Sequence, residues 1–264
     1  MRWLFKLLFI LISIPVFAQS VVKPLPNAHA HNDYEHTRPL YDALSYGFAS
    51  VEADIFLIDD ELYVYHDRPE TPSPNRTLKK LYLDPMFQRV MANGGKVYPN
   101  YDVSFFLMLD IKKEGEAVYQ KLKEILPAYD TMLTKYNGLE VEQGPVTIFL
   151  SGDRPIRTLM KEQNRLMALD GRPTDIGRGI HRAYMPVISG PYGLYLKWKG
   201  EGSIPPKDWR TLRLMVANAH GEGKKVRFWA SPDHPAVWKM LIRAQVDLIN
   251  TDDLEGLRDF LIKK

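Results

Sequence analysis

The stretch that decides the fold runs from His29 to Asp67 and reads HAHNDYEHTRPLYDALSYGFASVEADIFLIDDELYVYHD. It places histidines and carboxylates in three fragments, His29-Ala30-His31-Asn32-Asp33, Glu52-Ala53-Asp54 and Tyr65-His66-Asp67. Each fragment lies inside or at the end of a short run that is typical of a β-strand. Groups able to do chemistry therefore collect at strand ends, and we expect the rest of the chain to be their scaffold.

Strands and helices alternate along the chain outward from this stretch. The sequence predicts strands over residues 25–30, 49–57, 62–65, 104–111, 146–150, 165–169, 225–229 and 246–250. It predicts helices over residues 39–46, 78–91, 116–126, 155–163, 206–222, 235–244 and 254–262. This alternation indicates a parallel sheet, either a doubly wound open sheet or a closed α/β barrel, for which about 250 residues is typical.

The first 18 residues have the composition of a secretory leader. Arg2 and Lys6 precede an apolar run from Leu7 to Ile14, and Val16-Phe17-Ala18 fits a signal-peptidase site. A membrane anchor is the alternative, but the apolar run is short for a bilayer span of about 20 residues. The leader predicts a secreted or periplasmic protein, whose fold must hold without disulfides because the chain has no cysteine.

The rest of the composition sets wider limits. The formal net charge is only +3, so we expect no nucleic-acid partner. No repeat, low-complexity tract or Gly/Ser linker marks a domain boundary, so we expect one domain over residues 19–264. Residues 175–203 have no clear periodicity, and we expect a long loop there that contributes to substrate specificity or is a plain packing insert.

Three carboxylates suggest a site for a hard cation. Glu52 and Asp54 are two apart on a predicted strand, so their side chains leave one face about 7 Å apart at the Cα level. Asp110 follows a buried apolar run and should reach the same end of a parallel sheet. Oxygen donors without cysteine favour one divalent cation, Mg²⁺ or Ca²⁺. A solvated strand face is the alternative, but unpaired carboxylates are costly in such an apolar neighbourhood.

Two histidines complete the candidate site. His31 and His66 each follow a predicted strand, and two imidazoles can share general base and general acid work near neutral pH. His29 lies on the same strand face as His31 and could replace it, or support it through a hydrogen bond.

At this point the sequence resembles a known superfamily. The order His, Glu-x-Asp, His-Asp and then Asp110-Ile111-Lys112 is similar to the glycerophosphodiester phosphodiesterase and phosphatidylinositol-specific phospholipase C superfamily. Residues 246–253 resemble its last barrel strand and the turn after it. The opening His-Ala-His-Asn-Asp-Tyr is closer to a branch that includes the yeast "altered inheritance of mitochondria" type proteins.

The resemblance implies a TIM-type (β/α)8 barrel and a role for each candidate residue. His31 and His66 would be the acid/base pair, Glu52, Asp54 and Asp110 the metal ligands, and Lys112 a phosphate contact. Trp229 would be an aromatic wall of the pocket, unless it is an ordinary core residue. The implied substrate is a small-molecule or lipid phosphodiester, and a lipid would require transient contact with a membrane surface.

Two departures from the superfamily pattern stand out. Its first histidine is usually followed by Arg-Gly, whereas Asn32 and Asp33 follow here, so the substrate contacts near Asn32 and His29 are expected to be rearranged. The third metal ligand is often Glu, and Asp110 is one methylene shorter. The ion would then lie closer to that strand or keep an extra water.

Two other interpretations fit part of the sequence. A His-x-His at the end of a first barrel strand also begins metal-dependent amidohydrolases, and Asp252 would suit their catalytic aspartate. That interpretation leaves Glu52, Asp54 and His66 unexplained. A barrel that binds sugars or lipid head groups without catalysis is the second, and its mark would be the loss of a key group, which we do not find.

Overall fold

The computed structural model describes residues 22–263, so the predicted leader lies outside the described residues. Within this range eight parallel strands close into a ring in the order β1-β12-β11-β10-β9-β7-β4-β2, and β2 pairs again with β1. The strands of the ring are β1 (Leu25–Ala30), β2 (Phe48–Ile58), β4 (Phe105–Ile111), β7 (Val146–Gly152), β9 (Met167–Gly171), β10 (Val187–Pro191), β11 (Lys225–Trp229) and β12 (Leu248–Thr251). The predicted TIM-type (β/α)8 barrel is confirmed.

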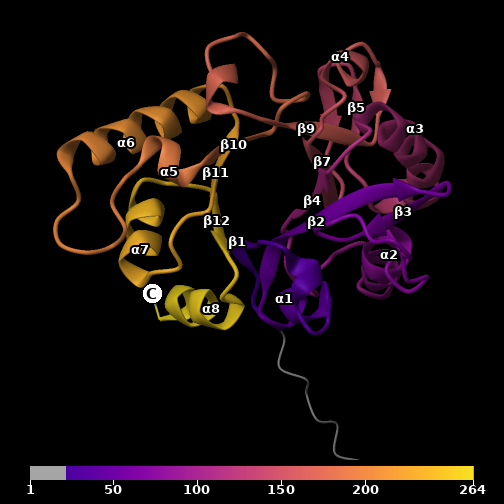
Figure 1. Cartoon of the computed structure of the whole chain (residues 1–264), viewed down its shortest axis with the longest axis horizontal. Coiled ribbons are helices and arrows are strands. Elements are labelled where there is room, and N and C mark those ends of the chain that lie inside the picture. Colours follow the sequence, from indigo (N-terminus) through magenta and orange to yellow (C-terminus); the bar gives the residue numbers. More distant parts are fainter. Residues whose placement is uncertain (1–21, 264) are drawn as a thin grey trace, which may run out of the picture.

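Helices surround the ring (Figure 1). They are α1 (Tyr41–Ser45), α2 (Asp84–Ala92), α3 (Gly115–Ile125), α4 (Ile156–Leu159), α5 (Tyr192–Tyr195), α6 (Pro206–Gly221), α7 (Pro235–Arg243) and α8 (Leu254–Ile262). Short 3₁₀ segments cover Asp33–Glu35, Leu126–Met132 and Pro173–Asp175, and a π-helical turn, Lys79–Leu83, leads into α2. None of the helices within residues 22–263 is long and apolar enough to cross a membrane.

The apolar core has two main parts because the barrel strands are covered on both faces. The larger part lies between the strands and the surrounding helices. The smaller part fills the barrel and consists of Met108, Phe149, Val187 and Leu248, with Phe106 packed against it. The barrel interior is therefore solid below its mouth, and polar chemistry is left to the strand ends.

Two features of the strand pattern differ from the prediction. The predicted strand at 62–65 is present as β3 (Glu61–Val64), but it pairs antiparallel with the extended end of β2 and lies outside the parallel ring. Its two-residue turn, Asp59-Asp60, has positive φ at both positions, as a type I′ hairpin requires. Because β3 turns back along β2, residues just after β3 return to the barrel mouth.

The eighth barrel strand lies in the segment predicted to be a long loop. Residues 175–203 contain β10 and α5, and β10 supplies the pairing between β9 and β11. Its sequence ends in Ser189-Gly190-Pro191, which hides the strand signal. Gly190 is needed there because a Cβ would lie 2.8 Å from Pro173 Cγ.

A second, small sheet lies beside the barrel in the order β6-β5-β8. It consists of β5 (Lys135–Asn137), β6 (Glu140–Glu142) and β8 (Asn164–Arg165), all antiparallel. These strands are too short to show a period of two in the sequence, and they were not predicted.

The loop after β1 is fastened by a buried carboxyl group. Asp33 Oδ2 accepts hydrogen bonds from the Leu40 backbone N–H at 2.6 Å and from the Tyr82 hydroxyl at 2.8 Å. Burial raises the pKa of Asp33 to about 7. Leu40 has φ 65°, a strained value for a leucine, and its N–H bond to Asp33 helps to hold it. This loop carries His31, so Asp33 ties the candidate site to Leu40 and to Tyr82 of the π-helical turn.

Asp33→Asn tests this buried carboxyl group. A pKa raised from 3.8 to about 7 means that Asp33 stabilises the fold fully below pH 4 and progressively less as the pH rises to 7. The stability of the wild type relative to Asp33→Asn should therefore fall over this range, by on the order of 1 kcal/mol per pH unit. Urea unfolding of both proteins at pH 5 and pH 7 measures this difference. A difference that does not change with pH would contradict the assignment.

Candidate active site

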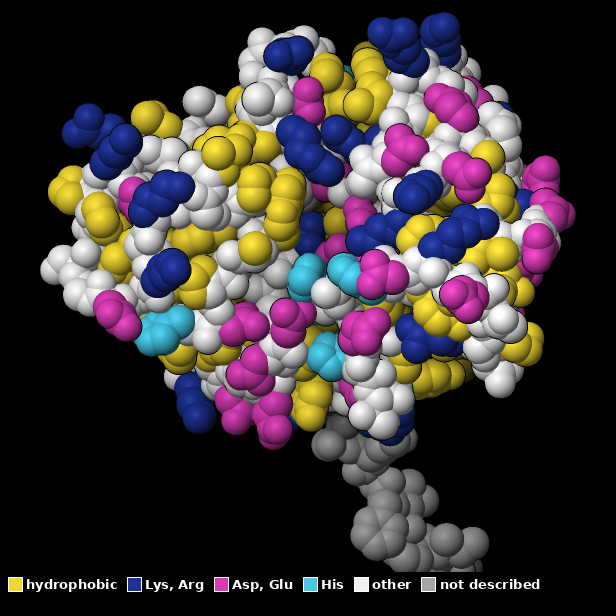
Figure 2. Space-filling view, in the orientation of Figure 1, with side chains coloured by type: hydrophobic (Ala, Val, Ile, Leu, Met, Phe, Trp, Pro, Cys, Tyr) yellow, Lys and Arg dark blue, Asp and Glu magenta, His cyan; other side chains and the backbone are white. Residues whose placement is uncertain are grey.

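The candidate site is a cavity of about 300 Å³ at the carboxyl ends of the barrel strands. In Figure 2 histidine, acidic and basic side chains gather around a hollow at the middle of this face. Predicted residues of three kinds line the cavity. They are the two candidate acid/base histidines, two of the three candidate metal ligands, and the candidate substrate contacts Lys112 and Trp229. The lining residues are His31, Asn32, Glu52, His66, Met108, Asp110, Lys112, Ser151, Arg172, Arg227 and Trp229.

The three predicted metal ligands come together. Glu52 and Asp54 lie on β2, and Asp110 lies beside Asp54 on β4, because the parallel register pairs these two residues. Each of the three offers an oxygen, and these oxygens lie within 4.8 Å of one another. Asp54 Oδ1 is buried and has no hydrogen-bond partner in the part of the chain described. An unsatisfied buried carboxylate oxygen beside two other carboxylates is a suitable donor for a hard cation.

Lys112 lies between two of these carboxylates. Its Nζ is 2.5 Å from Asp54 Oδ2 and 2.9 Å from Asp110 Oδ2. Burial alone would lower the pKa of Lys112, but the hydrogen bonds to both carboxylates raise it, so it is charged. Burial raises the pKa of Asp54, against the hydrogen bonds that it accepts from Lys112 and Tyr34.

Glu52 has a cation of its own deep in the barrel. Arg227 on β11 places Nη2 2.5 Å from Glu52 Oε2, and the same nitrogen donates to Asn250 Oδ1 at 2.6 Å. Burial would raise the pKa of Glu52, but the Arg227 charge and the nearby His29 lower it to about 2. Glu52 is thus ionised at any working pH, as a metal ligand must be.

His31 is held by a carboxylate from the opposite end of the chain. Its Nδ1 lies 2.7 Å from Asp252 Oδ1, just after β12. Burial would lower the pKa of His31, but the hydrogen bond to Asp252 and the charge of Glu52 raise it. This bond fixes the ring, so that Nε2 is the nitrogen left for chemistry.

His66 reaches the site from the hairpin that β2 and β3 form. Its Nδ1 lies 3.1 Å from Asp54 Oδ2 and 3.1 Å from the Tyr34 hydroxyl oxygen. The Tyr34 hydroxyl donates to Asp54 Oδ2 at 2.6 Å and lies 3.0 Å from Asn32 Oδ1. His66 therefore shares its carboxylate partner with a buried tyrosine, while its side chain is 58 % exposed.

His29 is part of the barrel wall and does not line the cavity. It is fully buried, with Nδ1 2.7 Å from Ser50 Oγ and Nε2 3.5 Å from Glu52 Oε2. Burial and the Arg227 charge lower the pKa of His29 to about 3, so the ring is neutral. His29 and His31 thus point to different partners and do not form a metal-binding pair.

Asn32 and Trp229 lie at the cavity on two strands, β1 and β11, that have β12 between them. Asn32 follows β1 and adopts φ 45°, a left-handed conformation that asparagine tolerates well. Trp229 is the last residue of β11, and the guanidinium carbon of Arg172 lies 5.2 Å from its ring centroid. Both residues are placed where a substrate could touch them.

Sequence reasoning missed Met108, Ser151, Arg172 and Arg227 of the cavity lining, and also Tyr34 and Asp252, which contact the two histidines. Arg227 carried a signal, since an arginine between Val226 and Phe228 in a buried strand needs a charged partner. Asp252 was considered only for the amidohydrolase alternative, because nothing local links it to His31. Tyr34 and Arg172 carried no sequence signal, because their contacts depend on how the loops fold.

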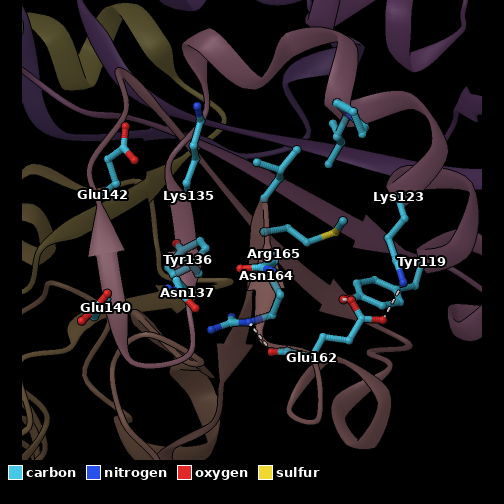
Figure 3. Close-up of a pocket in the computed structure, with 14 residues that line it drawn as sticks. Tyr119, Lys123, Lys135, Tyr136, Asn137, Glu140, Glu142, Glu162, Asn164 and Arg165 are labelled. Carbon is cyan, nitrogen blue, oxygen red and sulfur yellow. Dashed lines mark hydrogen bonds and ion pairs between the residues drawn. The ribbon is translucent and has the colours of Figure 1, made fainter.

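A second cavity, of about 580 Å³, lies outside the barrel between α3 and the small sheet (Figure 3). Its ionic groups are largely paired, since Glu162 binds both the Tyr119 hydroxyl at 3.0 Å and Lys123 Nζ at 2.7 Å. Arg165 donates to three backbone carbonyls, those of Glu162, Ala183 and Gly138. The acidic cluster and the histidine pair lie at the barrel mouth, so we place the candidate chemistry there.

Two family models match this chain. A model described as an AIM6-like phosphodiesterase domain matches residues 17–170. A model of the glycerophosphoryl diester phosphodiesterase family matches residues 225–255. The first covers β2 and β4, which carry the acidic cluster, and the second covers β11, which carries Arg227, and Asp252 just after β12.

Similar proteins agree with these models. "Altered inheritance of mitochondria protein 6 homolog" of Arthroderma benhamiae is 28 % identical over 90 % of this chain and 84 % of its own length. "Altered inheritance of mitochondria protein 6" of Eremothecium gossypii is 30 % identical over 90 % of this chain and 70 % of its own length. A crystal structure of glycerophosphodiester phosphodiesterase from Agrobacterium tumefaciens shares the fold, with a TM-score of 0.52 and 12 % identity over 89 % of this chain and 99 % of that one.

The prediction of a secreted or periplasmic protein is wrong. The relatives that match along most of the chain are fungal proteins named for the inheritance of mitochondria, and none of these names describes an exported protein. The prediction was based on residues 1–18, which lie outside the described residues.

The resemblance noted in the sequence is confirmed. The AIM6-like model covers more than half of the chain, and the Eremothecium gossypii relative is 30 % identical with 70 % of its length covered. The barrel fold is shared with the glycerophosphodiester phosphodiesterase structure from Agrobacterium tumefaciens. The chain belongs to the AIM6-like branch of the glycerophosphodiester phosphodiesterase superfamily.

Proposed function

We propose that this protein is a metal-dependent phosphoric diester hydrolase that acts on a glycerophosphodiester or a phospholipid head group. The observation that carries the proposal is the convergence of Glu52, Asp54 and Asp110, whose oxygens lie within 4.8 Å of one another beside a cavity that two histidines line. Family membership supports the reaction class. A small-molecule or lipid phosphodiester is the proposed substrate, and a lipid would bring the barrel mouth transiently against a membrane surface.

The three carboxylates would hold one divalent cation, Mg²⁺ or Ca²⁺. When bound, such a cation supplies positive charge beside a non-bridging phosphate oxygen and so lowers the energy of the charge that develops at phosphorus. Asp54 Oδ1, buried without a partner, and the ionised Glu52 fit this role. Lys112 already neutralises part of the cluster, and it adds a second positive charge at the place where a phosphate would lie.

The two histidines divide the proton transfers. One takes a proton from the attacking hydroxyl or water, and the other gives a proton to the leaving alkoxide. Asp252 orients His31 through Nδ1, and Asp54 with Tyr34 orients His66 through its own Nδ1. Each ring then presents its Nε2 for chemistry. A neighbouring hydroxyl of the substrate would give a cyclic phosphate, and water would give direct hydrolysis.

The first test is turnover of phosphodiesters by the purified protein. Bis-p-nitrophenyl phosphate, glycerophosphocholine and phosphatidylinositol are each offered with added Mg²⁺, Ca²⁺ or Mn²⁺, and again with EDTA. We expect turnover of at least one diester that EDTA abolishes and added cation restores. Asp110→Asn should weaken activation by the cation, and His66→Ala should lower kcat by about 10²-fold or more.

Two results would contradict the proposal. One is no turnover of any of the three diesters with any of the three cations. The other is turnover that persists in EDTA. A phosphodiesterase activity that survives His66→Ala with little loss would contradict the role of His66 alone. Arg157→Gln, on α4 and away from the lining of the mouth cavity, is a control that should keep wild-type activity.

The His31 and Asp252 pair makes a separate prediction. Asp252 raises the pKa of His31, so Asp252→Asn should lower that pKa. The limb of the pH profile of kcat/KM that belongs to His31 should then move to lower pH. Movement of the acid limb identifies His31 as the base, and movement of the alkaline limb identifies it as the acid. A profile in which neither limb moves would show that Asp252 does not act through His31.

A further inference from the structure

The mouth cavity has two sides with different chemistry. The three clustered carboxylates lie on β2 and β4, and each cation that lines the cavity has a carboxylate partner: Lys112 has Asp54, Arg227 of β11 has Glu52, and Arg172 has Asp170. Just after β9 and at the end of β11 the cavity is lined by Arg172 and Trp229. Neither of these two strands pairs with β2 or β4, whereas β7, which carries Ser151, pairs directly with β4. A phosphodiester whose phosphate lies at the cluster would extend one of its ester groups toward this second side.

Arg172 is fixed in place by the strand ends around it. Its Nη1 donates to Asp170 Oδ2 at 2.6 Å and to the Gly171 carbonyl at 3.0 Å, and Nη2 donates to Ser151 Oγ at 3.1 Å. Asp170 is fully buried, and Ser151 Oγ also donates to it at 3.0 Å. The guanidinium is therefore anchored along one edge. Within residues 22–263 its Nε has no hydrogen-bond partner, so part of its donor capacity is free.

The anchored guanidinium covers Trp229. The guanidinium carbon lies 5.2 Å from the Trp229 ring centroid, within the range of a cation–π contact. A free tryptophan face at this position would suit a quaternary ammonium group. Arg172 occupies that place with a positive charge of its own. A second cation brought beside it would meet repulsion, while an anion could bind the free donors.

We propose that Arg172, held over Trp229, selects substrates whose head group carries a second anionic group, such as a carboxylate or a phosphate, and disfavours quaternary ammonium head groups. This inference rests on the proposed phosphodiester hydrolysis and names the substrate class of that same site. The recognition is a charge-assisted hydrogen bond from a guanidinium that is already in position, so little ordering is needed on binding.

The test uses three glycerol 3-phosphate diesters of similar size. Their head alcohols are choline, 3,3-dimethylbutanol, which replaces the ammonium by a carbon, and 4-hydroxybutyrate, which ends in a carboxylate. Consumption of each diester is followed by ³¹P NMR with the cation that gives the highest activity, and this readout does not depend on which ester bond breaks. We expect kcat/KM to decrease in the order carboxylate, neutral and choline.

Three variants separate charge from structure. Arg172→Gln keeps a donor for Asp170 but removes the charge, and it should reduce the preference for the carboxylate over the choline diester by about tenfold or more. Arg172→Lys keeps the charge and should keep the order. Arg154→Gln is the matched control, because Arg154 also donates to Asp170, through the backbone carbonyl, but does not line the mouth cavity. It should keep the order too.

Several outcomes would overturn the inference. One is a choline diester hydrolysed as well as the carboxylate diester by the wild type. Another is an Arg172→Gln variant that loses activity equally on all three diesters, which would make Arg172 a structural residue only. If the diesters are hydrolysed but kcat/KM does not follow the charge of the head group, this inference is contradicted and the proposed function is not. If none of the diesters is hydrolysed, the proposed function and this inference are both contradicted.

Discussion

Buried negative charge at one end of the barrel is the constraint on which the candidate site depends. Three carboxylates there are almost inaccessible to water, and each would be too costly to keep ionised without a nearby cation. Each has a cation partner: Glu52 on β2 has Arg227 on β11, Asp54 on β2 has Lys112 just after β4, and Asp170 on β9 has Arg172 two residues later. The closed barrel is what allows Glu52 and Arg227 to meet. Cations thus already balance these buried carboxylates before any substrate or metal ion binds. A phosphate would bind as an additional charge among these ion pairs.

The part of the site that the sequence predicted is the part that strand geometry alone decides. Glu52 and Asp54 share a face because they are two residues apart on one strand, and Asp110 joins them because parallel neighbours pair in register. His31 follows the first strand of the ring directly. These relations need only the positions of strands along the chain, which the apolar runs show clearly. The barrel class follows in the same way from the regular alternation of strands and helices.

What the sequence could not predict depends on contacts between distant segments. The sequence predicted eight strands, but one of them, 62–65, is the return arm of a hairpin, and β10 was taken for loop because Gly190 and Pro191 obscure it. Asp252 binds His31, which is 221 residues away in the sequence, and Arg172 contacts Ser151 and Trp229 on other strands, so no local sequence pattern predicts these contacts. The hairpin did carry a local signal. Two aspartates between Ile58 and Glu61 are typical of a tight turn.

The separations along the chain between paired groups have a consequence for how the barrel folds. His66 and Asp54 are 12 residues apart, so the hairpin can bring them together while the rest of the chain is still disordered. Glu52 and Arg227 are 175 residues apart, so this carboxylate has no counter-ion until the last strands dock. Burial of Glu52 before that moment would be opposed by its desolvation. The negative charge of Glu52 is therefore neutralised by Arg227 only when the ring of strands closes. Without β11 the carboxylate of Glu52 would favour contact with water, so this ion pair as well as apolar packing favours the closed ring.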